Sequence, residues 1–152
     1  MTHHFLGLFI SISLFFTACE GPNLSSDKEV KKTYFTGGKI QSEFIMDDKT
    51  GKNGLLKKYG YSNTLTSKVT IRDGVPHGNE IGYDEGGRML WKYIYVNGNQ
   101  HGIQEAYYPN GTVMLSFTYV NGIKHGPASS YRLDGALQKK VMYKNGRLTG
   151  RR

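Results

Sequence analysis

The stretch that decides the fold runs from Asn97 to Gly126 and reads NGNQHGIQEAYYPNGTVMLSFTYVNGIKHG. It begins with Asn-Gly followed by the pair His101-Gly102, and it ends with Asn-Gly followed by His125-Gly126, 24 residues later. One further period upstream lies His77-Gly78. A fixed period of this length is typical of repeat proteins, in which each unit is one supersecondary element stacked on its neighbours.

Other residue types recur with the same period. They are a glycine that follows Asp or Asn, a tyrosine, and a glycine inside a second turn signal. Their positions are Gly74, Gly98, Gly122 and Gly146; Tyr59, Tyr83, Tyr107 and Tyr131; and Gly87, Gly111 and Gly135, with Asn63 in that last slot one unit earlier. No insertion interrupts the register between Gly54 and Gly150, and residues 34–51 resemble a further unit with a short insertion.

Each unit reads as two strands. In the quoted stretch, Thr112 to Val120 alternates Val, Leu, Phe and Tyr with Met, Ser and Thr, which predicts a strand with one buried face. Asn-Gly and Asp-Gly supply the positive φ angles that tight hairpin turns require. We therefore predict an all-β fold, an elongated antiparallel meander of stacked β-hairpins in which one repeat advances the sheet by roughly 10 Å. This repeat domain is predicted to cover residues 34–152, with one degenerate and about four regular units.

The N-terminal segment predicts export. Residues 1–18 contain no charged side chain apart from histidine, and the apolar run from Phe5 to Phe16 is too short to span a bilayer but fits a secretory signal. The run leads into Thr17-Ala18-Cys19, which resembles the lipobox of bacterial lipoproteins. We predict a lipoprotein signal peptide at 1–18, lipidation of Cys19, and a polar tether at 19–33. The alternatives are an uncleaved anchor, or an ordinary secretion signal with an incidental cysteine.

This resemblance implies a place in the cell. A lipid-anchored chain would lie in the bacterial cell envelope, and Glu20, which follows the cysteine where inner-membrane lipoproteins have Asp, favours the outer membrane of a Gram-negative cell. Since Cys19 is the single cysteine, no intramolecular disulfide is expected.

The net charge of +8 is concentrated at the C-terminal end. From Lys124 onward, eight basic residues face a single acidic one, Asp134. The candidate basic patch consists of Lys139, Lys140, Lys144 and Arg147. Such a patch fits anionic lipid or an acidic partner, although positive charge on a terminal strand also discourages edge-to-edge association of sheets. No motif supports binding of nucleic acid.

The three histidines of the repeat invite a metal-binding interpretation, which their spacing disfavours. Equivalent positions lie roughly 10 Å apart along a sheet, whereas the ligands of one ion lie about 2 Å from it. His77, His101 and His125 are therefore expected to shape the turn before each glycine. We expect no metal site and no cofactor.

The aromatic residues are candidates for a binding surface. Tyr83, Tyr107 and Tyr131 recur in phase, and Trp91, the single tryptophan, replaces Leu115 and Lys139 of the neighbouring units. A row of rings can bind a glycan or a peptide, but aromatic pairs also stabilise any sheet by cross-strand packing. No nucleophile and base, phosphate loop or recurring carboxylate pair is present, so we expect no catalytic residue and no enzyme activity.

The pattern resembles a known family. The segments Asn97-Gly98-Asn99-Gln100-His101-Gly102, Tyr107-Tyr108-Pro109-Asn110-Gly111 and Tyr119-Val120-Asn121-Gly122 are similar to the variant MORN repeat of bacteria, including the YwqK-like antitoxins of toxin-antitoxin systems. The resemblance covers almost all of residues 34–150. It implies a non-catalytic scaffold that binds a protein, with an antitoxin or immunity role as its narrower form. The alternative is a structural module of the envelope that binds lipid headgroups or cell-wall glycan.

Overall fold

The computed structural model describes residues 28–151. The predicted signal peptide, Cys19 and most of the predicted tether lie outside these residues.

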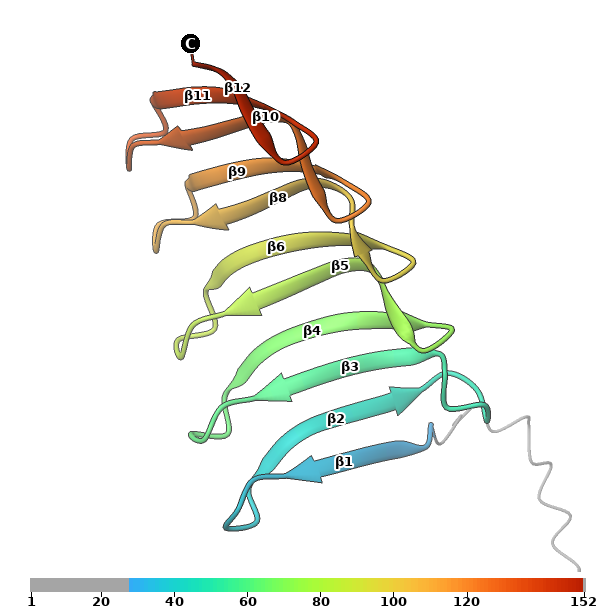
Figure 1. Ribbon diagram of the computed structural model, residues 1–152. Helices are drawn as coiled ribbons and strands as arrows, with labels where there is room; N and C mark the ends of the chain where they lie inside the picture. Colours follow the sequence, from blue (N-terminus) through green and yellow to red (C-terminus); the bar gives the residue numbers. More distant parts are fainter. Residues whose placement is uncertain (1–27, 152) are drawn as a thin grey trace, which may run out of the picture.

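The described residues form one antiparallel sheet of 12 strands that follow one another in sequence order, apart from the short β7, which pairs with β6 alone (Figure 1). The strands are β1 Val30–Tyr34, β2 Ile40–Met46, β3 Gly54–Tyr59, β4 Leu65–Arg72, β5 Val75–Tyr83, β6 Met89–Val96, β7 Asn99–Gln100, β8 Gly102–Tyr107, β9 Val113–Val120, β10 Ile123–Tyr131, β11 Leu137–Lys144 and β12 Arg147–Arg151. No helix occurs among them. The predicted all-β meander of hairpin repeats is confirmed.

The sheet begins earlier than the sequence pattern indicates. Strand β1 starts at Val30, inside the segment 19–33 that was expected to be a tether. All five residues of β1 are exposed, so the strand has no alternation of buried and exposed side chains that a sequence pattern would reveal. Backbone pairing with β2, from Val30 opposite Ile45 to Tyr34 opposite Ile40, holds it in place.

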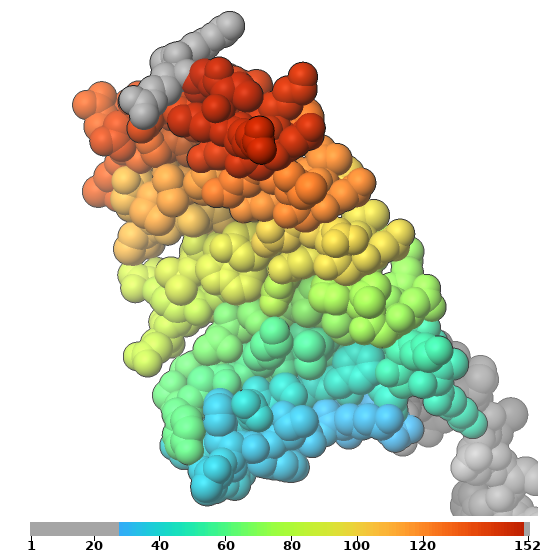
Figure 2. All heavy atoms as spheres, in the orientation of Figure 1, coloured from blue at the N-terminus to red at the C-terminus, as the bar shows by residue number. Residues whose placement is uncertain are grey.

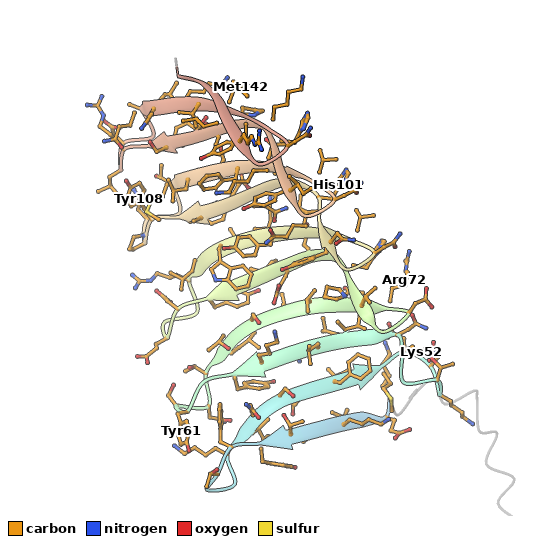
Figure 3. The ribbon with its side chains drawn as sticks, viewed as in Figure 1. Lys52, Tyr61, Arg72, His101, Tyr108 and Met142 are labelled. Carbon is orange, nitrogen blue, oxygen red and sulfur yellow. The ribbon has the colours of Figure 1, made fainter. Side chains whose placement is uncertain are left out.

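Two kinds of turn lie at the two edges of the ladder. At one edge the two-residue turns Asn-Gly and Asp-Gly have positive φ at both positions, for example 49° at Asn121 and 80° at Gly122, as a type I′ hairpin requires. At the other edge a longer turn closes each hairpin, as where Gly87 N–H donates to the carbonyl of Asp84 at 3.0 Å. Figure 3 shows Lys52, Arg72 and His101 along the first edge and Tyr61 and Tyr108 along the second.

The His-Gly pair marks a bulge beside the two-residue turns. Strand β10 pairs Lys124 with Tyr119 and then resumes with Ala128 opposite Phe117, so three residues, 125–127, face Thr118 alone. The same interruption separates Ile71 opposite Pro76 from the next pair in β4 and β5. A bulge of this kind bends a strand and increases its twist.

The bulges let each two-residue turn bond to the unit before it. Gly98 N–H donates to the carbonyl of Pro76 at 2.9 Å, and Gly122 N–H donates to the carbonyl of Gln100 at 2.8 Å. Equivalent bonds join Gly74 to Lys52 and Gly146 to Lys124. These four bonds form a turn ladder that ties successive repeats together in addition to the sheet itself.

The sheet is a single layer. Among residues 28–151 the buried apolar side chains are those of Met46, Val69 and Ala128, and no large side chain is completely buried. Figure 2 shows the units as successive bands, each in contact with the bands beside it. Most domains bury an apolar face between two layers. Because this sheet has no second layer among the described residues, both of its faces are open to contact.

Candidate binding surfaces

Cross-strand pairing defines two faces of the sheet. Trp91 pairs with Gly82 on one side and with Ala106 on the other, and Phe117 pairs with Gln104 and Ala128. We call the face that carries these residues the groove face. The Trp91 ring lies directly over Gly82, where an added Cβ would collide with it. Trp91 also stacks on Tyr93, with ring centroids 4.5 Å apart. Small residues on one strand therefore make room for large rings on the next.

The opposite face, which we call the charged face, carries two ion pairs and the predicted tyrosine row, while a further ion pair, Lys58 with Glu80 at 3.7 Å, lies on the groove face. Lys92 pairs with Glu105 at 3.1 Å, and Lys32 pairs with Glu43 at 3.1 Å. The hydroxyl of Tyr107 donates to Glu105 at 2.7 Å. Tyr59, Tyr83, Tyr107 and Tyr131 are all half-buried on this side. The structure thus brings the tyrosines together in one row and places Trp91 on the other face.

These tyrosines are engaged by their neighbours. Burial and the hydrogen bond to Glu43 raise the pKa of Tyr59 to about 12, and burial and the bond to Glu105 raise the pKa of Tyr107 to about 12. The bonds from Tyr107 and Lys92 outweigh the opposing effect of burial on Glu105 and lower the pKa of its carboxyl. Lys68 lies over the ring of Tyr83 at 5.6 Å. Tyr59, Tyr83 and Tyr107 therefore interact with charged residues of the sheet itself.

The groove face contains two neighbouring pockets that share Leu115 and Phe117. The first, about 170 Å³, lies between β6 and β9. The second, about 190 Å³, lies between β9 and β12. The first is lined by Tyr93, Gln100, Gln104, Glu105, Ala106, Leu115, Phe117 and Tyr119, and the second by Leu115, Phe117, Ala128, Ser129, Ser130, Lys139, Val141, Tyr143 and Leu148. Most positions of the first pocket recur 24 residues later in the second, so one site is repeated along the sheet.

Gln104 fills part of the first pocket. Its side chain is buried, accepts a bond from the N–H of Ile94 at 2.7 Å, and donates to the carbonyl of Ile94 at 3.1 Å. It thereby replaces backbone pairing where the contact of β6 with β8 is limited to the pairs at Trp91 and Lys92.

A lysine lies over the aromatic rings of the groove face. Lys124 Nζ is 4.2 Å from the ring centroid of Phe117 and 5.4 Å from that of Tyr143. Cation–π contacts of this kind contribute about 0.5 to 2 kcal/mol according to how far the cation is desolvated.

The predicted basic patch is divided between the two faces. Lys139 lines the second pocket. Lys140 pairs with Ser129, the residue next to Ala128, and so lies on the charged face. Lys144 pairs with Arg147 at the turn between β11 and β12. The four residues share the C-terminal end of the sheet but form no single surface.

The histidine slot of the repeat contacts the following turn. Asn53 occupies this slot one unit before His77, and its side-chain oxygen accepts a bond from the backbone N–H of Asp73 at 2.9 Å. His125 Nδ1 lies 3.2 Å from the side-chain oxygen of Asn145 and 3.5 Å from its backbone nitrogen, and the imidazole tautomer decides which bond forms. The contact is with the turn of the next repeat, rather than with the turn before the histidine's own glycine.

Residues 28–151 contain no group of three or more His, Cys, Asp or Glu that could hold a metal ion. In the same part of the chain, no helix has the length and apolar character needed to span a membrane.

Gln104 and Ala128, which line the pockets, and Lys124, which lies over the rings of Phe117 and Tyr143, are among the residues of the groove face that the sequence did not point to. The signal that identifies them is departure from the repeat, since each differs from the residue 24 positions away at a slot that lies on the groove face.

Comparison with known families agrees with the geometry. Residues 100–121 and 124–145 match the model of the MORN repeat variant, and each segment spans one hairpin repeat of the sheet. Repeats of this family are generally non-catalytic and take part in binding. Comparison with curated proteins finds no match.

Proposed function

We propose that these MORN repeats form a non-catalytic scaffold, held at a bacterial membrane by lipid on Cys19, whose groove face binds a protein partner. The observation that carries this proposal is the open groove face of a single-layer sheet. Trp91, Tyr93 and Phe117 are only half-buried there. Tyr93 and Phe117 line the first pocket, Phe117 also lines the second, and Trp91 stacks on Tyr93. Aromatic residues in concave, partly apolar surfaces are common anchors of protein interfaces.

We place the partner on the groove face, although the charged face also has a cavity, of about 380 Å³, whose lining includes Glu105 and Tyr131. The phenol groups of Tyr59 and Tyr107 already donate to carboxylates, and a partner on that side would have to displace those bonds. The rings of Trp91 and Phe117 have no such competing bonds to break. Covering them would remove apolar area from water at about 25 cal/mol per Å².

The narrower form of the proposal is an antitoxin or immunity role. The resemblance of the sequence pattern to YwqK-like antitoxins supports it, and the predicted export favours a toxin that acts in the envelope rather than in the cytosol. The sheet would neutralise this toxin by direct contact. Co-expression with toxin genes encoded nearby tests this role, because the absence of both growth rescue and co-purification would refute it.

Partner binding is tested with the tagged full chain expressed in its own type of cell, followed by chemical crosslinking and purification. Trp91→Ser should abolish co-purification of any specific partner. Tyr83→Ser, one strand away on the charged face, is the matched control and should retain it. Equal loss with both variants, or no loss with Trp91→Ser, would contradict use of the groove face.

Anchoring is tested separately. Cys19→Ser should block lipidation and processing, so that the chain incorporates no labelled fatty acid and keeps the mass of the precursor. Unchanged processing and fatty-acid labelling in this variant would exclude a lipid anchor at this cysteine.

A second candidate function is direct binding of lipid headgroups or cell-wall glycan, which the basic C-terminal end favours. Co-sedimentation of the fragment from Ser25 onward with anionic vesicles and with peptidoglycan, at low and high salt, distinguishes it. Salt-sensitive sedimentation with either would support this function, and sedimentation with neither would leave the protein partner as the proposal.

A further inference from the structure

The residues around the second pocket can be compared with those at the same positions of the preceding repeats. Three positions that surround it differ from the equivalent positions of the two preceding units. They are Lys124 in place of Gln100 and Pro76, Ala128 in place of Gln104 and Glu80, and Lys139 in place of Leu115 and Trp91. All three changes lie on the groove face, at one place.

The replacement of glutamine by alanine at position 128 opens the second pocket. Gln104 bonds to the backbone of Ile94 and occupies the first pocket, whereas Ala128, which is buried at the same repeat position, has no side chain beyond Cβ. The floor of the second pocket is therefore apolar, formed by Phe117, Val141 and the small Ala128.

The other two changes surround this apolar floor with positive charge. Lys124 Nζ lies above the Phe117 ring, and Lys139 lines the pocket. Within residues 28–151, no carboxylate lies within salt-bridge distance of either ammonium group. Asp134, the single acid after Glu105, accepts a bond from the N–H of Ala136 in its own turn. Both cations thus remain available to an acceptor from outside.

We propose that the second pocket binds an acidic segment of the protein partner, with an apolar side chain on Phe117 and Val141 and neighbouring carboxylates paired with Lys124 and Lys139. This inference rests on the proposed function and names the chemistry of the partner. Charge complementarity carries it: apolar contact gives the affinity, and the two ammonium groups select an acidic sequence and accelerate its association.

The test uses residues 19–152 with Cys19→Ser, so that neither the predicted signal peptide nor a lipid is present. Three capped heptapeptides are titrated into the isotope-labelled protein: Ser-Glu-Asp-Phe-Asp-Glu-Ser, the same peptide with Ser in place of Phe, and Ser-Lys-Lys-Phe-Lys-Lys-Ser. Amide NMR shifts report the site and the affinity. The acidic Phe peptide should shift the amides of β9, β10 and β11, and both other peptides should bind at least about tenfold more weakly.

Variants locate the contact. Lys124→Gln and Ala128→Gln each restore a residue that an earlier repeat already accommodates, so neither should disturb the fold. Each should weaken binding of the acidic Phe peptide by roughly threefold to tenfold. Lys140→Gln removes the same charge from the charged face and is the matched control, which should retain the affinity.

The outcomes separate this inference from the proposed function. No shift with the acidic peptide, equal binding of the basic peptide, or equal weakening by Lys140→Gln and Lys124→Gln would overturn the inference. So would binding of anionic vesicles in preference to the acidic peptide. If cellular co-purification still depended on Trp91 but not on Lys124, the scaffold function would stand and the acidic site would be refuted.

Discussion

The side-chain oxygen of Asn53 accepts a hydrogen bond from the backbone N–H of Asp73 at 2.9 Å, across the interface between two repeats. Asn53 occupies the slot that histidine fills in the next three units. Two of those units lack the equivalent hydrogen bond, because the buried Nδ1 atoms of His77 and His101 have no hydrogen-bond partner among the described residues.

The first prediction follows from this difference. His101→Asn should stabilise the protein by about 1 kcal/mol, because the shorter side chain is expected to accept a bond from the following turn as Asn53 does. Denaturant unfolding measures the change. His101→Leu has similar bulk but no acceptor, and a gain with Leu equal to that with Asn would rule out the hydrogen bond as the cause.

The second prediction concerns the close approach of Trp91 to Gly82. Gly82→Ala should displace the indole from its stack on Tyr93 and destabilise the protein by about 1 to 3 kcal/mol, because the new methyl group occupies the space of the ring. Since Trp91 is the single tryptophan, its fluorescence reports the displacement directly. Gly150→Ala is the control, as nothing lies within 4 Å of an added Cβ there. An unchanged emission spectrum for Gly82→Ala would contradict the packing.

The third prediction concerns the two-residue turns. Asn121 has a φ of 49°, which costs most residues about 1 to 2 kcal/mol but which asparagine adopts more readily. Asn121→Ala should therefore lower the free energy of unfolding by about 1 kcal/mol. Asn79→Ala, in an exposed strand position without positive φ, serves as the comparison and should change it little. Equal effects of the two changes would show that the turn conformation is not the reason.

The fourth prediction is an alkaline transition. The pKa of Tyr59 and of Tyr107 is about 12 in the folded protein, against about 10 in an unfolded chain. Because the folded pKa is raised, the stabilisation is fully present below pH 10 and is lost as the pH rises from about 10 to about 12. The tyrosinate absorbance should show Tyr59 and Tyr107 among the late-titrating groups, together with Tyr95 and Tyr119, whose pKa burial also raises. Glu105→Gln should bring Tyr107 forward without moving Tyr59. Titration of all tyrosines in one step near pH 10 would contradict both shifts.

Much of the fold could be predicted from the sequence, because the period repeats each turn signal in several units. Asn63 illustrates this: it stands in the slot of Gly87, and it indeed has a positive φ of 63°. Strand β1 was missed because its five residues are all exposed, so pairing with β2 leaves no trace in the order of apolar and polar residues.

The candidate site was harder to predict. Alternation along a strand shows that the sheet has two faces. It does not show the register between strands, which decides where an aromatic ring of one strand lies beside a small residue of the next. Trp91 and Tyr83 were therefore grouped as one candidate surface, although the pairing of Trp91 with Gly82 places them on opposite faces. The two pockets depend on the side chains of several strands at once, and the signal for the second lies in the differences between repeats rather than in what they share.

The turn ladder has a consequence for how such a molecule changes over evolutionary time. Each two-residue turn bonds only to the unit before it, as Gly122 does to Gln100, so a unit gained or lost as a whole block of one period leaves every remaining bond with an equivalent partner. Duplication or loss of one block would lengthen or shorten the groove by about 10 Å. The length of the groove face therefore depends on the number of repeats, while its binding chemistry depends on a few substitutions within one repeat.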